Sequence, residues 1–371
     1  MTGDFFLTQW FFLGMRWLCE NVLSNNIFLT ILISTVLLRL LTLFSDIKQR
    51  KSSAKTAEIQ PQLEVLNKRY ANDPQRLQQE QAKLMKESGV SMFSGCLPMI
   101  LTLVLLFCFI AAFRFWGFEQ DVKTLTETSA NIAVAMKGLG YAEADDTDAE
   151  CMDKLSKLDK NKVDKVYEET AISETAKNSE FLWINNIWQP DNGFSPVVVP
   201  AETFFGANYK STKKLIYFEE HPEEKEKLKE LGIFYDETEG YKDMSKDEQK
   251  KLQDAAYARY NELMTPLTLH HSGHNNGWFI LPVLSTLFQL LYIWYNQKHT
   301  PQAASNAQGQ GSMKLMLYIM PVMSFVFCLS YTAAFALYWT LSSITMLIVN
   351  ILLAKFMKTN KKNTIKTKKE A

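Results

Sequence analysis

Residues 27–44, IFLTILISTVLLRLLTLF, form an apolar stretch with a single charge inside it, Arg39. The stretch is close to the roughly 20 residues with which an α-helix crosses the hydrocarbon core of a bilayer. At about 1.5 Å per residue, Arg39 lies roughly 7 Å from the Phe44 end of such a helix. A charge at that depth is costly and normally faces water or a polar group, so Arg39 is the first candidate functional residue.

Apolar stretches of similar length recur later in the 371-residue chain, which is 47% apolar. We therefore predict an all-α membrane protein with five transmembrane helices, at residues 27–44, 97–113, 278–295, 315–331 and 332–354. The last two follow each other so closely that we expect an antiparallel pair. None of the five stretches contains Asp or Glu, so inside them Arg39 would be stabilised by water, by a hydroxyl such as Thr35 or by an amide such as Gln289.

These helices divide the chain into five segments. We expect an interfacial amphipathic helix at 1–26, spans one and two at 27–118 with a cytoplasmic helical hairpin at 46–95, a large extracytoplasmic loop at 119–277, spans three to five at 278–354 and a basic cytoplasmic tail at 355–371. The first segment lacks the basic start and the cleavage site of a signal peptide. It places Gln9, Arg16 and Glu20 on one face, which indicates a helix lying in the membrane interface, with a sixth span as the alternative.

The distribution of charge predicts the orientation of the chain. The loop at 119–277 holds 31 acidic and 19 basic residues, whereas the rest of the chain holds 9 acidic and 21 basic residues. Most of those bases lie in the hairpin and in the tail. Because positively charged segments stay on the cytoplasmic side, we expect the N-terminus and the acidic loop outside and the C-terminus inside.

The hairpin has clear local signals. A helix continues beyond the first span through Pro61 and is expected to turn at the NDP sequence, where Asp73 can cap a second helix that begins at Pro74 and stops near Gly89. Apolar residues on one face of each helix allow the two to pack, namely Leu63, Leu66 and Tyr70 against Leu77 and Leu84.

Other residue types argue against catalytic chemistry. The spacing of His270 and His274 would suit a metal site on a helix, and His271 lies between them, but Gly273 and the following NNG predict a loop, so we expect no metal site. The five cysteines are expected to be small apolar fillers. We find no nucleophile with a base and no phosphate-binding loop, and we expect neither an enzyme nor a cofactor.

Several segments resemble the YidC family of membrane protein insertases, in the family's order. They are TVLLRLLT around Arg39, IQPQLEVLNKRYANDPQRLQQEQAKLMKESGV in the hairpin, SGCLPMI at the second span, FLWINNIWQPD before the third and FALYWTLSS in the fifth. The sequence departs from the family in two places. The second span continues as MILTLVLLF, without the Gln and second Pro often found there. A segment from about Gly193 to His274 resembles an insertion between FLWINNIWQPD and GWFILPVL.

The resemblance implies a hydrophilic groove that opens to the cytoplasm and to lipid, with Arg39 at its base. Thr35 and Gln289 would help to hydrate this groove, and Tyr338 and Trp339 of FALYWTLSS are the further candidates for its lining. The implied function is that of an insertase and chaperone, which captures hydrophilic segments of client membrane proteins in the groove and releases their transmembrane helices into the bilayer.

The resemblance also implies partners and a location. The partners are client proteins, the lipid bilayer and the ribosome, which the basic tail would contact, together with a Sec translocon and the signal recognition particle pathway. The location is the bacterial cell membrane. A transporter or channel and a noncatalytic membrane-complex assembly subunit remain as alternatives. A transporter usually shows several ionisable residues within its spans, or internal repeats, and this sequence shows neither.

Overall fold

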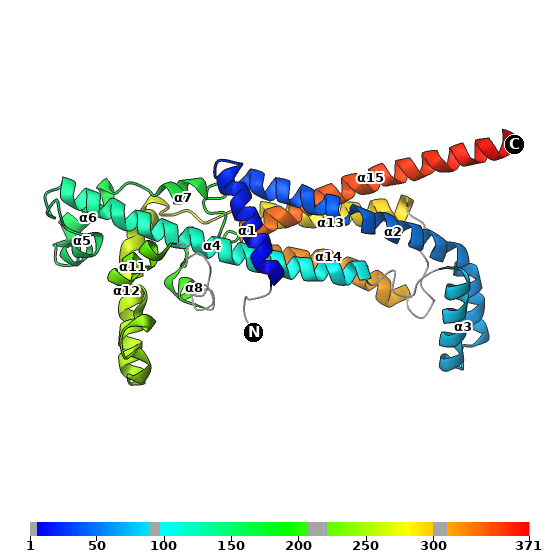
Figure 1. Ribbon diagram of the computed structural model, residues 1–371, viewed down its shortest axis with the longest axis horizontal. Helices are drawn as coiled ribbons and strands as arrows, with labels where there is room; N and C mark the ends of the chain where they lie inside the picture. The colour runs from blue at the N-terminus through cyan, green and yellow to red at the C-terminus, as the bar shows by residue number, and fades with distance from the viewer. Residues whose placement is uncertain (1–5, 90–96, 207–217, 219–220, 300–309, 371) are drawn as a thin grey trace. The chain divides into compact units, whose positions relative to one another are not determined.

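The computed structural model describes residues 6–89, 97–206, 218, 221–299 and 310–370, and these residues form helices and no β-strand (Figure 1). They divide into two compact units. The loop unit comprises Met1–Phe28, Ile110–Trp278 and Thr332–Ala334. The span unit comprises Leu29–Phe109, Phe279–Tyr331 and Phe335–Ala371. The prediction of an all-helical chain is confirmed.

Long apolar helices make up most of the span unit. Its elements are α2 (Ile27–Arg69), α3 (Pro74–Glu87), the first part of α4 (Leu97–Gly138), α13 (Ile280–His299), α14 (Gln310–Ser330) and most of α15 (Ala333–Glu370). Within the described residues, two segments are long and apolar enough to cross a membrane, Ile27–Phe44 and Ala333–Lys355, and Tyr318–Ser330 is a shorter apolar helix. The first and fifth predicted spans therefore meet this test, and the five-span topology stays a prediction.

The last three predicted spans lie in α13, α14 and α15. Helices α13 and α14 lie side by side. Two residues separate α14 from α15, and Figure 1 shows both helices leaving this joint in the same direction, so the two run antiparallel. Large apolar side chains of the span unit face outward, among them Leu41 and Phe44 of α2, each 78% exposed. Such a surface is unfavourable in water and suits contact with lipid.

The hairpin forms as predicted. The Asp73 side chain accepts a hydrogen bond from the backbone N–H of Arg76 at 3.1 Å and so caps α3. Between the two helices, Ile59 and Leu63 form a small apolar cluster with Leu84 and Met85. The amide of Gln81 also donates to the side-chain oxygen of Asn67 at 2.6 Å, which fixes the register of the pair.

Helix α4 is longer than the sequence indicates. The predicted boundary between membrane and loop segments at residue 119 falls inside it, and the helix continues unbroken to Gly138. No proline occurs between Pro98 and Gly138, so nothing in this part of the chain removes a helical hydrogen bond. The second half of α4 becomes the central helix of the loop unit.

The loop unit is a folded helical domain whose architecture could not be derived from sequence. Its further elements are α1 (Phe6–Asn21), α5 (Asp148–Leu155), α6 (Lys160–Glu169), α7 (Glu174–Asn178), α8 (Ala201–Phe204), α11 (Pro222–Glu230), η1 (Tyr235–Glu237), η2 (Tyr241–Asp243) and α12 (Lys246–His270). Side-chain caps start several of these helices, including capping boxes at Thr147 and Ser245. Its core includes stacked aromatic rings. The centroid of the Phe204 ring lies 5.0 Å from that of Phe118 and 4.7 Å from that of Tyr260.

The N-terminal helix α1 exists as predicted, but its polar face has a different environment from the one expected. Phe12, Met15 and Cys19 are buried in the loop unit, and so is Arg16, which is 7% exposed. Trp10 and Trp17 remain exposed on the same helix. Arg16 is thus directed into protein, because the loop unit supplies carboxylates to pair with it.

The cysteines behave as apolar fillers. Cys19, Cys108, Cys151 and Cys328 are buried and form no disulfide among the described residues, and Cys96 lies outside the described residues.

Candidate functional site

The predicted site begins on α2, inside the first span. Arg39 is half-buried, and its backbone carbonyl accepts a hydrogen bond from the Thr42 hydroxyl at 3.2 Å. Thr35, one turn earlier, is buried and donates its hydroxyl to the carbonyl of Ile31 at 2.6 Å. Because that hydroxyl proton is used within the helix, Thr35 can offer only its oxygen lone pairs to a neighbour.

Helix α15 brings Tyr338 close to Arg39. The Tyr338 hydroxyl interacts with the Ser342 side chain and lies within electrostatic range of Arg39. The Tyr338 ring stacks on Phe109 of α4, with centroids 4.3 Å apart and planes inclined by 8°. Two residues of the predicted site, from the first and fifth spans, are therefore brought together in the span unit.

Trp339 and Gln289 are placed differently. Trp339 packs on Phe335 with ring centroids 5.7 Å apart, and its indole N–H is buried without an acceptor among the described residues. A buried donor of this kind normally finds a hydrogen-bond partner. Gln289 is half-exposed on α13, and its predicted role in hydrating the site stays a prediction.

Sequence reasoning missed several hydroxyls buried between the last three predicted spans. Ser285 of α13 donates to the Pro282 carbonyl at 2.9 Å and lies 3.4 Å from the sulfur of Cys328 on α14. Thr340 of α15 lies 3.4 Å from the carbonyl of Leu281. Ser324 of α14 is buried with no hydrogen-bond partner among the described residues. The sequence signal that could have identified these hydroxyls is the presence of serine and threonine within otherwise apolar runs.

The FLWINNIWQPD sequence, residues 181–191, has a structural role in the loop unit. The buried Asn276 side chain donates to the carbonyls of Asn186, Gln189 and Pro190 at 2.7, 3.0 and 3.1 Å. Its side-chain oxygen accepts from the backbone N–H of Asn186 at 2.7 Å. The two ends of the segment that resembles an insertion are thus joined at its base by one asparagine.

Asp191 makes a second connection at the same place. Its carboxylate accepts from the backbone N–H of Trp278 at 2.9 Å and from the indole of Trp183 at 3.3 Å. A Cβ atom on Gly277 would lie 2.9 Å from Cγ and 3.0 Å from Cα of Asp191, so only glycine fits there.

The same sequence also caps α15. The backbone N–H groups of Ala333 and Ala334 donate to the carbonyls of Gln189 and Ile187 at 2.9 and 2.8 Å. The first N–H groups of a helix have no partner within it, and here the motif supplies one for each of these two residues.

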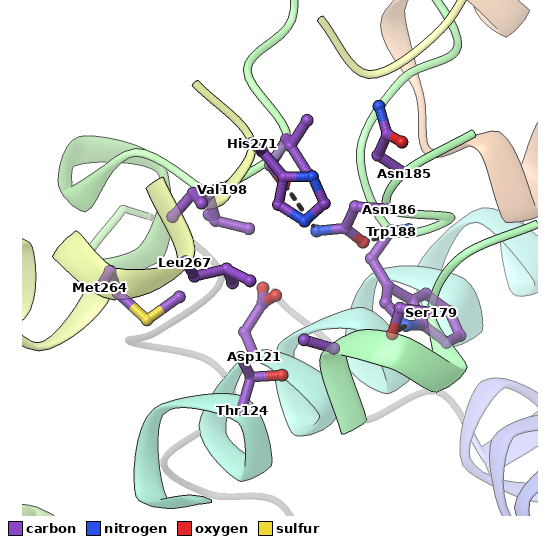
Figure 2. A pocket seen from close by; sticks show the side chains of 13 residues that line it. Asp121, Thr124, Ser179, Asn185, Asn186, Trp188, Val198, Met264, Leu267 and His271 are labelled. Carbon is purple, nitrogen blue, oxygen red and sulfur yellow. Dashed lines mark hydrogen bonds between the residues drawn. The ribbon is translucent and has the colours of Figure 1, made fainter. Parts of the chain in front are cut away.

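A small cavity lies beside this motif in the loop unit. Figure 2 shows Asp121 of α4 pointing into it from one side and His271, just after α12, from the other. Burial raises the pKa of the Asp121 carboxyl well above its usual range. Burial, together with the neighbouring His270 and His274, lowers the pKa of His271 to about 4, so its imidazole is neutral at pH 7.

Glu119 forms the centre of a buried ion-pair cluster in the loop unit. It lies 3.4 Å from Nε of Arg16 and 3.1 Å from Nζ of Lys123, and both cations also approach Glu20, at 3.3 and 3.5 Å. Arg16 and Glu119 are 103 positions apart in the chain, so no local sequence pattern predicts their pairing.

Comparison with known proteins gives a consistent result. A family model described as the 60Kd inner membrane protein matches residues 18–233 and 240–362. A membrane protein insertase YidC of Clostridium perfringens is 46% identical over 79 residues, which cover 21% of this chain and 33% of that protein. The protein of the same name from Clostridium tetani is 37% identical over 94 residues, which cover 24% of this chain and 43% of that protein. The chain therefore spans less than half the length of these relatives.

Proposed function

Because the chain belongs to the 60Kd inner membrane protein family, the family of the YidC insertases, we propose that it is a membrane protein insertase of the bacterial cell membrane. In this proposal, a hydrophilic segment of a client protein enters a groove in the span unit, and the client's apolar helix then moves into lipid. The proposal also includes the finer topology of five spans, with the N-terminus outside and the C-terminus in the cytoplasm.

The observation that carries the proposal is the position of Arg39. Arg39 is half-buried in the otherwise apolar stretch Ile27–Phe44 of α2, and it lies within electrostatic range of Tyr338 on a second helix. In surroundings of low dielectric constant, a guanidinium attracts carboxylates more strongly than it does in water. Arg39 would thus draw the acidic residues of a client segment partway into the membrane.

Such an attraction needs only to be weak. A client span of about 20 apolar residues supplies most of the driving force when it enters lipid. Tight binding at Arg39 would slow the release of the client. The buried Trp339 N–H and the Gln289 amide would offer further hydrogen bonds to a polar segment in transit.

Further partners follow from the charge of the chain. The basic residues of 355–371, which continue α15, would contact ribosomal RNA while a client is being synthesised, and they would also contact anionic lipid. We include the Sec translocon and the signal recognition particle pathway as partners that would deliver clients.

Replacement of Arg39 tests the mechanism. We expect Arg39→Ala to impair the insertion of clients with acidic outer segments by tenfold or more, and to impair neutralised versions of the same clients much less. Arg39→Lys should retain much of the activity, since it keeps the charge but loses the paired donors of the guanidinium. The measurement is insertion into proteoliposomes containing the purified variant.

A matched control is Arg69→Ala, the same substitution at the exposed end of α2. It should leave insertion of both kinds of client unchanged. Equal insertion of acidic and neutral clients by the wild type and by Arg39→Ala, at equal protein levels, would rule out the electrostatic role of Arg39.

A further inference from the structure

Glu180, His270 and His271 converge in the loop unit. Their carboxylate and imidazole ligand atoms all lie within 4.8 Å of one another. His270 ends α12 and His271 follows it, with the two rings edge to face at 4.8 Å. Glu180 follows α7 and precedes the FLWINNIWQPD sequence, so the cluster joins two segments 90 positions apart in the chain.

The backbone holds both segments in place. On one side, the N–H of Glu180 donates to the Lys177 carbonyl at 3.2 Å, and the neighbouring Ser179 accepts from the buried Trp188 indole at 3.2 Å. On the other side, the N–H of His271 donates to the Leu267 carbonyl at 3.2 Å. The positions of the three Cα atoms are thus set by ordered helix ends, whereas Glu180 and His270 carry exposed side chains that can adjust.

We propose that Glu180, His270 and His271 bind a divalent transition-metal ion, with Zn²⁺ the best match. Two imidazoles and one carboxylate form a donor set that Zn²⁺ uses in proteins, with a water molecule in the fourth position. Imidazole donors exclude Mg²⁺ and Ca²⁺ as preferred ions, because those ions favour oxygen ligands. The site lies outside the span unit and is independent of the proposed insertase mechanism.

The geometry requires a modest contraction. Ligand atoms at about 2.0 to 2.2 Å from a tetrahedral Zn²⁺ lie roughly 3.3 to 3.5 Å apart, so the three side chains must close by about 1 Å or slightly more. The side chains of Glu180 and His270 are exposed, and their rotation would supply this contraction.

The cluster differs from the histidine run in the sequence. His274, which has the i, i+4 spacing from His270, is not a member, and its ring nitrogen instead contacts the Ser272 carbonyl at 3.2 Å. Gly273 has a φ of +77°, so the helix does not continue to His274. The expectation of a loop at this position is confirmed, and the third ligand comes from Glu180.

A bound ion would cross-link the end of α12 to the segment after α7. The Asn276 side chain already links these two parts of the chain through its hydrogen bonds with the backbone of Asn186. Because an ion that binds only the folded state stabilises it, Zn²⁺ should stabilise the loop unit.

The test uses the full chain in detergent, purified with an affinity tag that contains no histidine. Zn²⁺ binding is measured by competition with a chromogenic chelator, and Co²⁺ is added separately to record the visible spectrum. We expect one Zn²⁺ per chain, an intense Co²⁺ band of the kind given by a four-coordinate site, and a higher unfolding temperature with Zn²⁺.

The variants Glu180→Gln, His270→Ala and His271→Ala should each weaken Zn²⁺ binding by tenfold or more and remove the Co²⁺ band. His274→Ala and His221→Ala are the matched controls and should bind as the wild type does. Unfolding temperatures without metal show that each variant is folded. Equal Zn²⁺ affinity of the wild type and the His270→Ala variant, or an equal loss in His274→Ala, would overturn the proposal.

Discussion

At the scale of single residues, Glu119 shows how burial and pairing compete. Its carboxylate has no exposed surface and is accompanied by Arg16 and Lys123. Burial nevertheless outweighs the two cations, and the pKa of Glu119 is raised above its ordinary value. The cluster therefore holds α1 against α4 only while both cations offset the cost of taking this carboxylate out of water.

Arg16→Met should destabilise the loop unit in a pH-dependent manner. Above about pH 4.5 the carboxyl of Glu119 is ionised in the unfolded chain. Folding of the variant must then bind a proton or bury a charge with Lys123 alone, at a cost of roughly 1 to 3 kcal/mol. A raised folded-state pKa means that this cost is largest at neutral pH and shrinks as the pH falls toward 4.5. The measurement is the unfolding temperature at pH 7.5 and pH 5.

The control for this prediction is Lys162→Met, which removes an exposed ion pair with Asp159 at 2.9 Å. Exposed pairs contribute little, so this variant should unfold close to the wild-type temperature at both pH values. A loss in Arg16→Met that is the same at pH 7.5 and at pH 5 would contradict the role given to Glu119.

At the scale of elements, the FLWINNIWQPD sequence acts as a junction. Its backbone carbonyls accept hydrogen bonds from the first N–H groups of α15 and from the Asn276 side chain. The Asp191 carboxylate accepts a hydrogen bond from the backbone N–H of Trp278, just before α13. The segment from about Gly193 to His274 leaves and returns at this junction, where Pro196 and Asn275 form an isolated bridge. The Asn276 hydrogen bonds and this bridge together close the base of the segment.

Asn276→Ala should weaken the junction. It removes the donor for three carbonyls and the acceptor for the Asn186 N–H, and buried groups left without a partner cost about 1 to 3 kcal/mol. We expect a lower unfolding temperature and faster proteolysis within the loop unit. Asn275→Ala, which changes an exposed neighbour whose amide donates to the Gly193 carbonyl, is the matched control and should have a much smaller effect. Similar proteolysis of both variants would show that the junction does not depend on Asn276.

At the scale of the whole molecule, charge predicts the orientation in the membrane. The hairpin is basic and the loop unit is acidic, and both are folded helical structures. Cys151 is the native cysteine in the acidic loop, but it is fully buried and burial raises the pKa of its thiol. A buried thiol cannot report which side of the membrane it occupies.

Introduced cysteines test the orientation instead. Lys160 lies exposed at the start of α6 and Glu87 lies exposed at the end of α3. In a background with Cys96→Ser, an impermeant thiol reagent added to intact cells should label Lys160→Cys and not Glu87→Cys. After the cells are opened, both should be labelled, and the parent protein provides the background level. Labelling of Glu87→Cys in intact cells would reject the proposed topology.

Features that depend on neighbouring positions could be predicted from the amino-acid sequence. Apolar runs locate α2 and α15, Asp73 and Pro74 locate the start of α3, and the apolar stripe with Leu63 and Leu84 predicts the packing of the hairpin. The single charge in an apolar run identifies Arg39. Each of these follows from helix periodicity, capping or the cost of a charge in lipid, and all of these act over a few residues.

Contacts between residues that are distant in the chain could be identified only from the folded structure. Arg16 forms an ion pair with Glu119, Asn276 forms hydrogen bonds with Asn186, and Glu180 lies near His270. The tertiary fold of the loop unit brings the members of each pair together. Sequence periodicity does not predict these contacts, because each depends on the path of the chain between the two residues. The same reason explains why α4 could be recognised as a helix but not as the centre of a folded domain. A hydrogen bond or ion pair in a core depends on packing in three dimensions, whereas the start of a helix and its apolar face can be recognised from neighbouring residues.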